Sequence, residues 1–458
     1  MSIARVLGAG VALVLTMAFA CAQTGPDLFV APRPSQGPAA TVAEKRVASL
    51  KQAAKRTKDG SASNVHVVAI DPALLAAPEN LTGFRFKIGD RPYSVSGALE
   101  SRTKDGFSWF GKVDGEKLST VILVVRDGKV TGEVRGPKVG LLHIVPLGDG
   151  NHAIAEIDQA VLPPDHGPSE DRPSLWKRLK AKLSPKSGPA KRSPGPPEPD
   201  TDDASASAPS RVFTLSILVG YTDQASKELA DVEGDIALAE QQANFSYKNS
   251  GVTIRLKVVK TESSSYDETK KDALLTHKVM DYPDLLKKRS LYGADIAALV
   301  LSDLQRKDRR GNITHPCGTS LKTGAGFSKA FVAVQASCLT RKATMTHEIG
   351  HIIGARHNRE ETESPAPCGV QWDHGPTFSY GHGLYSIPGQ WATIMSYNCN
   401  PGANVCGRIL YWSNPDLTDE HGTPMGDQKY ANETKCLNRG ITQFCDPRGP
   451  APCRLPSL

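Results

Sequence analysis

Two hydrophobic patterns divide the chain into an N-terminal and a C-terminal half. Between residues 65 and 161 apolar and polar positions alternate in short runs, for example at 84–88, which is typical of strands with one buried face. The apolar runs 121–125 and 130–134 flank Asp127-Gly128, a dipeptide that favours a tight hairpin turn. Further strand-like runs lie at 141–145 and 153–157. This half therefore predicts a small β-rich domain, and it holds no cluster of chemically active residues.

The pattern changes after residue 210. A buried-type strand at 212–219 is followed by a long helical segment at 232–250, which Gly251 ends. An alternating strand at 252–258, a helical segment near 272–288 and a strand at 295–301 continue the order. Strands that alternate with helices predict an α/β (α+β) unit around a central mixed twisted sheet.

Two stretches are too polar to fold alone. Residues 23 to about 60 predict a loosely ordered lead-in, and residues 166–209 predict a linker dense in Pro, Ser, Lys and Asp. Within this linker, residues 175–183 form a basic amphipathic pattern, which fits either a solvated turn or a contact with an anionic membrane. Lys191-Arg192 is a candidate processing site in the same linker.

The first 22 residues predict an export signal. Arg5 precedes an apolar run at 6–20, and small residues around position 20 offer a cleavage site. Cys21 also allows a lipoprotein reading, so secretion, periplasmic retention and lipid anchoring all remain open. No other run is long and apolar enough to predict a transmembrane span.

The cysteines and the charge support an exported, disulfide-bonded protein. Of nine cysteines, eight lie from Cys317 onward, an even number that predicts up to four disulfides stapling a C-terminal subdomain. A thiolate zinc site would need close Cys-x-x-Cys pairs, and none is present. The net charge of +7 is explained by ordinary solubility and a basic linker, and does not indicate nucleic-acid binding.

The chemistry concentrates in residues 347–357. On a helix, His347 and His351 lie one turn apart on one face, the spacing at which two imidazoles bind one zinc ion. Glu348 stands beside them as a candidate general base, Gly354 permits the chain to leave the helix with a positive φ, and His357 can add a third nitrogen. Three protein ligands and one position for water are typical of a single catalytic Zn²⁺. The competing interpretation is an amphipathic core helix with surface histidines. The apolar stripe of Met345, Ile349, Ile352 and Ile353 lies opposite His347 and His351, and this division favours a buried helix that presents ligands into a cleft.

The long form of this motif resembles the metzincin zinc endopeptidases. The segment 392–397 matches their methionine turn, with Met395 at its centre, and the segments 380–383 and 413–415 give the chain the look of bacterial reprolysin-like metallopeptidases. The resemblance covers roughly residues 210–446. One departure is Asn358, which follows the last histidine where venom-type reprolysins usually have Asp.

This resemblance implies a metzincin-like zincin catalytic domain preceded by a β-rich prodomain. Met395 would pack under the imidazoles, and Tyr397 would either help to hold the oxyanion or serve in packing. Residues 331–335 would form the edge strand along which a substrate lies as an added antiparallel strand. His374 and His382 are expected to be structural or surface residues.

The predicted protein is a secreted zinc endopeptidase. A zinc-activated water would attack the peptide bond, with Glu348 accepting its proton and returning it to the leaving amine. The predicted boundaries are a signal peptide at 1–22, a propeptide or retained accessory domain at 23–165, the linker at 166–209, the peptidase domain at 210–446 and a tail at 447–458. The propeptide would act as an inhibitor and protein or peptide would be the substrate. Two alternatives are an inactive zinc-stabilised adhesion protein and a zinc hydrolase of non-protein amides.

Overall fold

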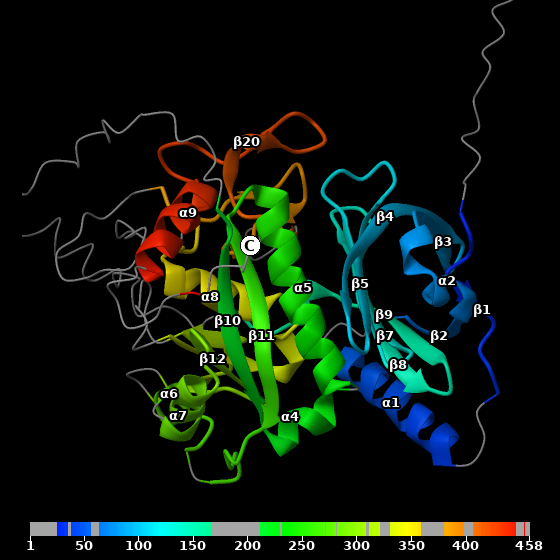
Figure 1. Ribbon diagram of the computed structural model, residues 1–458, viewed down its shortest axis with the longest axis horizontal. Helices are drawn as coiled ribbons and strands as arrows, with labels where there is room; N and C mark the ends of the chain where they lie inside the picture. Colours follow the sequence, from blue (N-terminus) through cyan, green and yellow to red (C-terminus); the bar gives the residue numbers. More distant parts are fainter. Residues whose placement is uncertain are drawn as a thin grey trace, which may run out of the picture.

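A computed structural model of the chain describes an N-terminal unit and a C-terminal unit (Figure 1). The N-terminal unit comprises residues 25–34, 38–55 and 64–165. The C-terminal unit comprises Cys453 and residues 211–445, except for 230, 271, 281, 308–310, 321–329, 359–379 and 398–405. The predicted signal segment, Cys21, the linker 166–209 with its basic pattern and Lys191-Arg192, His374 and all of the tail except Cys453 lie outside the described residues. Among the helices that the structure describes, none combines the length and the apolarity required to cross a membrane.

The N-terminal unit is built on a nine-stranded antiparallel sheet with the order β1-β2-β9-β8-β7-β6-β5-β4-β3. Asp127 and Gly128, at φ values of 48° and 73°, form the predicted turn between β6 and β7. The strands, taken in chain order, are β1 Phe29–Val30, β2 Val65–Ile70, β3 Gly83–Ile88, β4 Arg91–Thr103, β5 Gly106–Val113, β6 Thr120–Arg126, β7 Lys129–Gly136, β8 Gly140–Gly148 and β9 Asn151–Glu156.

The predicted loose lead-in was wrong. Residues 38–55 form the 18-residue helix α1 (Pro38–Lys55), which lies against β8. The segment has a high Ala content and its few apolar residues are widely spaced, so its composition looked like that of a linker. Ala43 and Val47 nevertheless pack on a small cluster of Val145, Leu147 and Ala153. Shorter helices are α2 (Pro72–Ala76), η1 (Pro78–Asn80) and η2 (Gln159–Val161).

The C-terminal unit contains a five-stranded mixed sheet with the order β11-β10-β12-β16-β15. The first four strands are parallel and β15 is antiparallel to β16. The strand β16 (Phe331–Gln335) is therefore an inner strand, and the prediction that residues 331–335 form the edge was wrong. The edge strand beside it is β15 (Gly318–Ser320). The others are β10 (Phe213–Tyr221), β11 (Ile254–Ser263) and β12 (Ile296–Leu301).

The helices of the C-terminal unit follow the predicted order with one change. The helix α5 (Val232–Ser250) has its predicted bounds and ends at Gly251, whose φ is 73°. The predicted helix near 272–288 is two helices, α6 (Thr276–Met280) and α7 (Pro283–Leu291), because the proline ring cannot continue a helix but suits a first turn. The short helices α4 (Asp223–Glu228) and η4 (Ala336–Cys338) are the other helices that the described residues form before the motif helix α8 (Thr344–Ile353).

Among the described residues after α8 regular structure is sparse, as predicted, with one exception. The 12-residue helix α9 (Glu433–Phe444) packs its Leu437 and Ile441 into the main core, and it begins with the side chain of Asn432 as its N-cap. The other elements are the short strands β17 Tyr385–Ser386, β18 Trp391–Ala392, β19 Gly407–Arg408, β20 Asn414–Thr418 and β21 Pro424–Met425, and earlier in the chain β13 Arg306–Lys307 and β14 Ile313–Thr314. Disulfides join Cys317 to Cys338 and Cys445 to Cys453, and Cys406 and Cys436 are also disulfide-bonded.

The two units share one hydrophobic core. The helix α5 lies between the nine-stranded sheet and the five-stranded sheet (Figure 1), in contact with β6, β7 and β11. Phe110, Ile122 and Val124 of the N-terminal sheet belong to the same buried cluster as the apolar faces of α5 and α8. Burial of apolar surface is the main driving force for such packing, so the N-terminal unit is held against the C-terminal unit by a continuous apolar contact.

Candidate metal centre and cleft

The helix α8 presents the motif because its sequence divides into two faces. Met345, Ile349, Ile352 and Ile353 are fully buried in the main core, as the apolar stripe predicted. The helix ends at Gly354, whose φ of 124° lies in the region that favours glycine. The amide of Gly354 donates to the carbonyl of Gly350 at 3.0 Å, and the chain then turns back toward the helix.

The three motif histidines meet at one point. The Nε2 atom of His357 lies 3.2 Å from Nε2 of His347 and 3.1 Å from Nε2 of His351. The ligand atoms of these three residues all lie within 4.8 Å of one another, and all three side chains are buried. Among the described residues, they are the one cluster of His, Cys, Asp or Glu with the spacing of a metal site.

The hydrogen bonds behind the rings fix which nitrogen faces the centre. Nδ1 of His347 lies 2.8 Å from the carbonyl oxygen of Ile394, and Nδ1 of His351 lies 2.9 Å from that of Ala355. A carbonyl oxygen only accepts, so both Nδ1 atoms donate and both Nε2 atoms carry lone pairs toward the centre. Lone pairs packed this closely repel unless a cation lies between them. A tetrahedral Zn²⁺ with Zn–N bonds of about 2.0–2.1 Å separates its nitrogens by about 3.3 Å, so the donor set fits zinc.

Glu348 lies on the same helix, fully buried beside the histidines. Burial raises the pKa of its carboxyl well above the usual value, and the nearby carboxylate of Asp165 raises it further; a hydrogen bond with Ser320 acts in the opposite direction. Gly318 of the edge strand β15 is so close that an added Cβ would lie 2.8 Å from Oε1 of Glu348. The carboxylate therefore lies between the metal centre and the edge of the sheet.

Met395 lies against the helix α8. Its side chain is fully buried, and a Cβ added to Gly350 would lie 2.9 Å from its sulfur. The ring of Trp412 lies 2.7 Å from the same position. A side chain at position 350 would therefore push the helix away from both Trp412 and Met395.

Tyr397 packs on a metal-centre histidine. Its ring lies 4.2 Å from the ring of His357, centroid to centroid, with an interplanar angle of 41°. The amide of Tyr397 donates to Oδ1 of Asn358 at 3.0 Å. Asn358, the departure from the family pattern, thus ties the end of the motif to the methionine turn. His382 supports the same loop, since its Nδ1 lies 2.7 Å from the carbonyl oxygen of His357.

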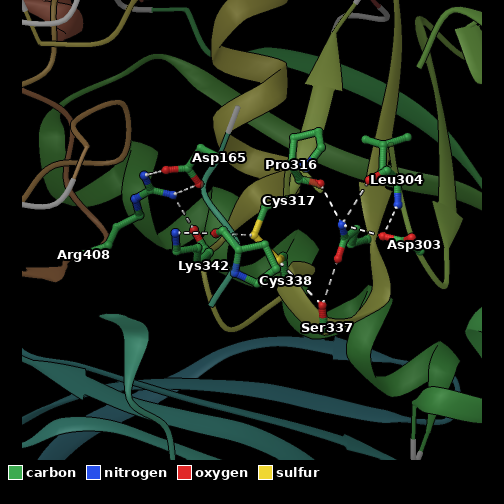
Figure 2. Close-up of a disulfide and its surroundings, with 11 residues drawn as sticks. Asp165, Asp303, Leu304, Pro316, Cys317, Ser337, Cys338, Lys342 and Arg408 are labelled. Carbon is green, nitrogen blue, oxygen red and sulfur yellow. Dashed lines mark hydrogen bonds and ion pairs between the residues drawn. A yellow bond between two sulfur atoms is a disulfide. The ribbon is translucent and has the colours of Figure 1, made fainter. Parts of the chain in front are cut away.

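A buried ion pair that the sequence analysis did not predict lies beside this centre. Arg408 of β19 binds Asp165, the last described residue of the N-terminal unit, and Lys342 lies next to them just before α8 (Figure 2). None of these residues belongs to a local motif. They come together only through the tertiary fold, so the sequence carried no signal for them.

Comparisons with known proteins agree with this geometry. Residues 211–413 match a reprolysin family model described as Metallo-peptidase family M12. The chain is 28% identical over 446 residues to a peptidyl-Asp metalloendopeptidase of Xanthomonas campestris pv. campestris, with 93% of this chain and 94% of the relative covered. It is 29% identical over 407 residues to a protein of the same name from Stenotrophomonas maltophilia (strain R551-3), with 82% and 85% covered. At 93% coverage, the first likeness extends through the N-terminal unit.

Proposed function

The chain is a reprolysin-like metalloendopeptidase, and on that premise we propose that it is a secreted zinc endopeptidase, made as a zymogen, that cleaves proteins beside aspartate. The observation that carries the proposal is the convergence of three imidazole Nε2 atoms next to Glu348, at separations of 3.1 and 3.2 Å from His357. The donor set favours zinc because three neutral imidazoles are typical zinc ligands.

The proposed metal ligands are His347, His351 and His357. A bound zinc ion supplies Lewis acidity and lowers the pKa of a coordinated water to about 7. The carbonyls of Ile394 and Ala355 hold two of the rings so that Nε2, and not Nδ1, faces the centre. Met395 forms the floor under the helix and does not act as a ligand.

Glu348 is the proposed general base. Its carboxylate accepts a proton from the attacking water and later donates it to the leaving amine. Gly318 on one side and the metal-centre histidines on the other leave the carboxylate little freedom, and such positioning is worth several kcal/mol in bimolecular steps. Tyr397 is proposed to hold the developing oxyanion. Its stacking on His357 also fits the alternative of a packing role, which removal of its hydroxyl would distinguish.

The proposed substrate path follows β15. This strand is at the edge of the sheet and lies against Glu348, so an extended peptide can add to it as an antiparallel strand. The preference for aspartate is inferred from the relatives, which are named peptidyl-Asp metalloendopeptidases.

The N-terminal unit is the proposed propeptide and inhibitor. Its residues 163–165 hydrogen-bond to the start of β15 and to Lys342, beside the catalytic centre. No cysteine lies between Cys21 and Cys317, so a carboxylate or steric cover must inhibit the enzyme in place of a thiol. Export is proposed from the signal-like segment 1–22 and from the disulfides of the C-terminal unit.

A non-protein amide remains a second candidate substrate class. A cell-wall amide would use the same centre, but it would gain little from an edge strand that offers backbone hydrogen bonds. The adhesion alternative, an inactive protein on the same fold, is dropped because the chain is a metalloendopeptidase.

The test uses the purified full-length chain and denatured casein. We expect cleavage after the linker is processed, loss of cleavage in a chelator, and recovery on addition of zinc. Sequencing of the product termini by mass spectrometry should show aspartate next to the cut bonds. Chelator-resistant cleavage would contradict the metal centre, and amide release from peptidoglycan without casein cleavage would favour the second candidate.

A further inference from the structure

Asp165 is bound as a ligand would be. Its two carboxylate oxygens accept separate bonds from Arg408, Oδ1 from Nη1 at 3.0 Å and Oδ2 from Nη2 at 2.6 Å (Figure 2). The side chains are 1% exposed for Arg408 and 2% for Asp165. A bidentate pair of a guanidinium and a carboxylate combines the strongest common ion-pair geometry with high selectivity for a planar acid.

Arg408 is oriented by its own unit. Its Nη1 donates to the carbonyl of Lys342 at 2.9 Å, and its Nη2 donates to the carbonyl of Ser396 at 3.0 Å. Lys342 directly precedes α8 and Ser396 follows Met395 in the methionine turn. Two bonds of the guanidinium therefore come from its own unit, at the start of the catalytic helix and at the methionine turn, and neither of them involves Asp165.

A second cation shares the same space. Lys342 is buried, and its Nζ donates to the carbonyl of Pro163 at 2.8 Å. Burial would raise the pKa of Asp165, but the charges of Arg408 and Lys342, with a smaller one from His347, outweigh burial and lower it. Two buried cations without a counter-ion would be costly, and in the full-length chain the side chain of Asp165 is their counter-ion.

The backbone of the same segment lies at the edge of the sheet. The amide of Cys317 donates to the carbonyl of Pro164 at 2.7 Å, and the amide of Gly318 donates to that of Asp165 at 3.3 Å. Asp165 is thus bonded to Gly318, the residue of β15 that lies against Glu348. The residue numbers rise together on both segments, so the N-terminal segment runs in the same direction as β15.

We infer that Arg408, assisted by Lys342, is the residue that selects an aspartate side chain next to the scissile bond, and that Asp165 occupies this subsite in the full-length chain as a substitute for the substrate. The inference rests on the proposed endopeptidase function. It adds the residues that bind the aspartate side chain of the substrate, and the contact of Asp165 that keeps the substrate out.

The direction of the segment explains why it is a block and not a substrate. A substrate that adds antiparallel to β15 runs opposite to residues 163–165, so Asp165 fills the same subsite while its peptide bonds are presented in reverse.

The length of the acidic side chain also matters for selection. Asp165 reaches Arg408 across one methylene while its backbone is bonded to Gly318, so glutamate, with one more methylene, would have to displace one of these contacts in a fully buried space.

The first arm of the test removes the block. In the full-length, zinc-loaded chain, Asp165→Asn keeps the shape of the side chain but removes its charge. We expect at least a tenfold higher kcat/KM than wild type on a peptide with a single Asp. The matched control is Asp90→Asn, in the exposed turn between β3 and β4, which should leave the rate at the wild-type level. Equal rates in Asp165→Asn and Asp90→Asn would overturn the blocking role.

The second arm tests selection, in the Asp165→Asn background, with peptides that differ only in Asp, Asn or Glu at one position. The ratio of kcat/KM for Asp over Asn should fall by about 10²-fold in Arg408→Gln, because bonds to a buried charge are lost. It should fall several-fold in Lys342→Gln, and it should be retained in Arg255→Gln, at an exposed position of β11. If Arg408→Gln does not fold, Lys342→Gln decides alone.

The outcomes separate the two claims. An unchanged Asp-over-Asn ratio in the Arg408 and Lys342 variants, with chelator-sensitive cleavage present, overturns the inference and leaves the endopeptidase function in place. If no variant cleaves any peptide, the proposed function fails and the inference fails with it. An ion pair that serves only the interface between the units would raise the rate in Asp165→Asn but leave the ratio unchanged in Arg408→Gln.

Discussion

Removing one ring from the contact between the two units should release the N-terminal unit from β15 and the metal centre. Phe110 of β5 packs edge-on against Phe245 of α5, with centroids 4.8 Å apart and an interplanar angle of 65°. Phe107, three residues earlier, points to the opposite face and belongs to the separate core of the N-terminal sheet. The pair offers a contact variant, Phe110→Ala, and a matched control, Phe107→Ala.

The size of the effect follows from burial and ring geometry. Burying a phenylalanine side chain contributes about 1.5–3 kcal/mol, and an edge-to-face aromatic pair contributes about 0.5–1.5 kcal/mol more. Phe110 is 7% exposed, so nearly the full stabilisation from burial and ring contact is present in the docked state. Its loss should cost about 2–4.5 kcal/mol of docking free energy. At tenfold per 1.4 kcal/mol, the undocked population should rise by about 30- to 1,600-fold.

Amide hydrogen exchange measures the undocked population directly. In a Glu348→Ala background, which prevents self-cleavage, Phe110→Ala should speed amide exchange in α5 and at Cys317 and Gly318. Phe107→Ala destabilises the N-terminal sheet itself and should speed exchange there first. If both variants leave exchange at positions 317 and 318 equally slow, the apolar contact does not control access to the cleft and the reasoning is refuted.

Two further predictions concern single residues of the two units. Burial lowers the pKa of His152 to about 4, and its Nε2 accepts a hydrogen bond from the amide of Val130. Between pH values of about 6.5 and about 4, His152 is therefore protonated in the unfolded chain but neutral in the folded chain. Stability should therefore fall by about 1.4 kcal/mol per unit as the pH drops from about 6.5 to about 4, and His152→Gln should lose less stability than wild type over that window in thermal unfolding. Gly318→Ala should lower kcat/KM about 10- to 100-fold at unchanged zinc content, because its Cβ would lie 2.8 Å from Glu348; wild-type rates would contradict this close approach.

The sequence predicted the elements whose signals are local. The helix 232–250 was predicted to the residue because its periodicity ends at a glycine, and the turn at Asp127-Gly128 because that dipeptide favours positive φ at both positions. Spacing alone identifies the five motif residues from His347 to His357, and in the structure the imidazoles of the three histidines among them lie together.

The sequence failed where the outcome depends on distant partners. The edge strand β15 has three residues and no periodicity, so the apolar run 331–335 was taken for the edge although strands pair on both its sides. The helix α1 was missed because its few apolar residues find their partners on β8, about a hundred residues away. Arg408 and Asp165 are 243 positions apart, and no local pattern relates them.

In the proposed function, three histidines hold a catalytic metal beside Glu348. Zinc content and peptide hydrolysis, measured together on Glu348→Ala and His357→Ala, test it most directly. We expect Glu348→Ala to bind one zinc per chain and to lose hydrolysis by several orders of magnitude, whereas His357→Ala should lose both zinc and hydrolysis. Full zinc content in His357→Ala, or hydrolysis retained in Glu348→Ala, would contradict it.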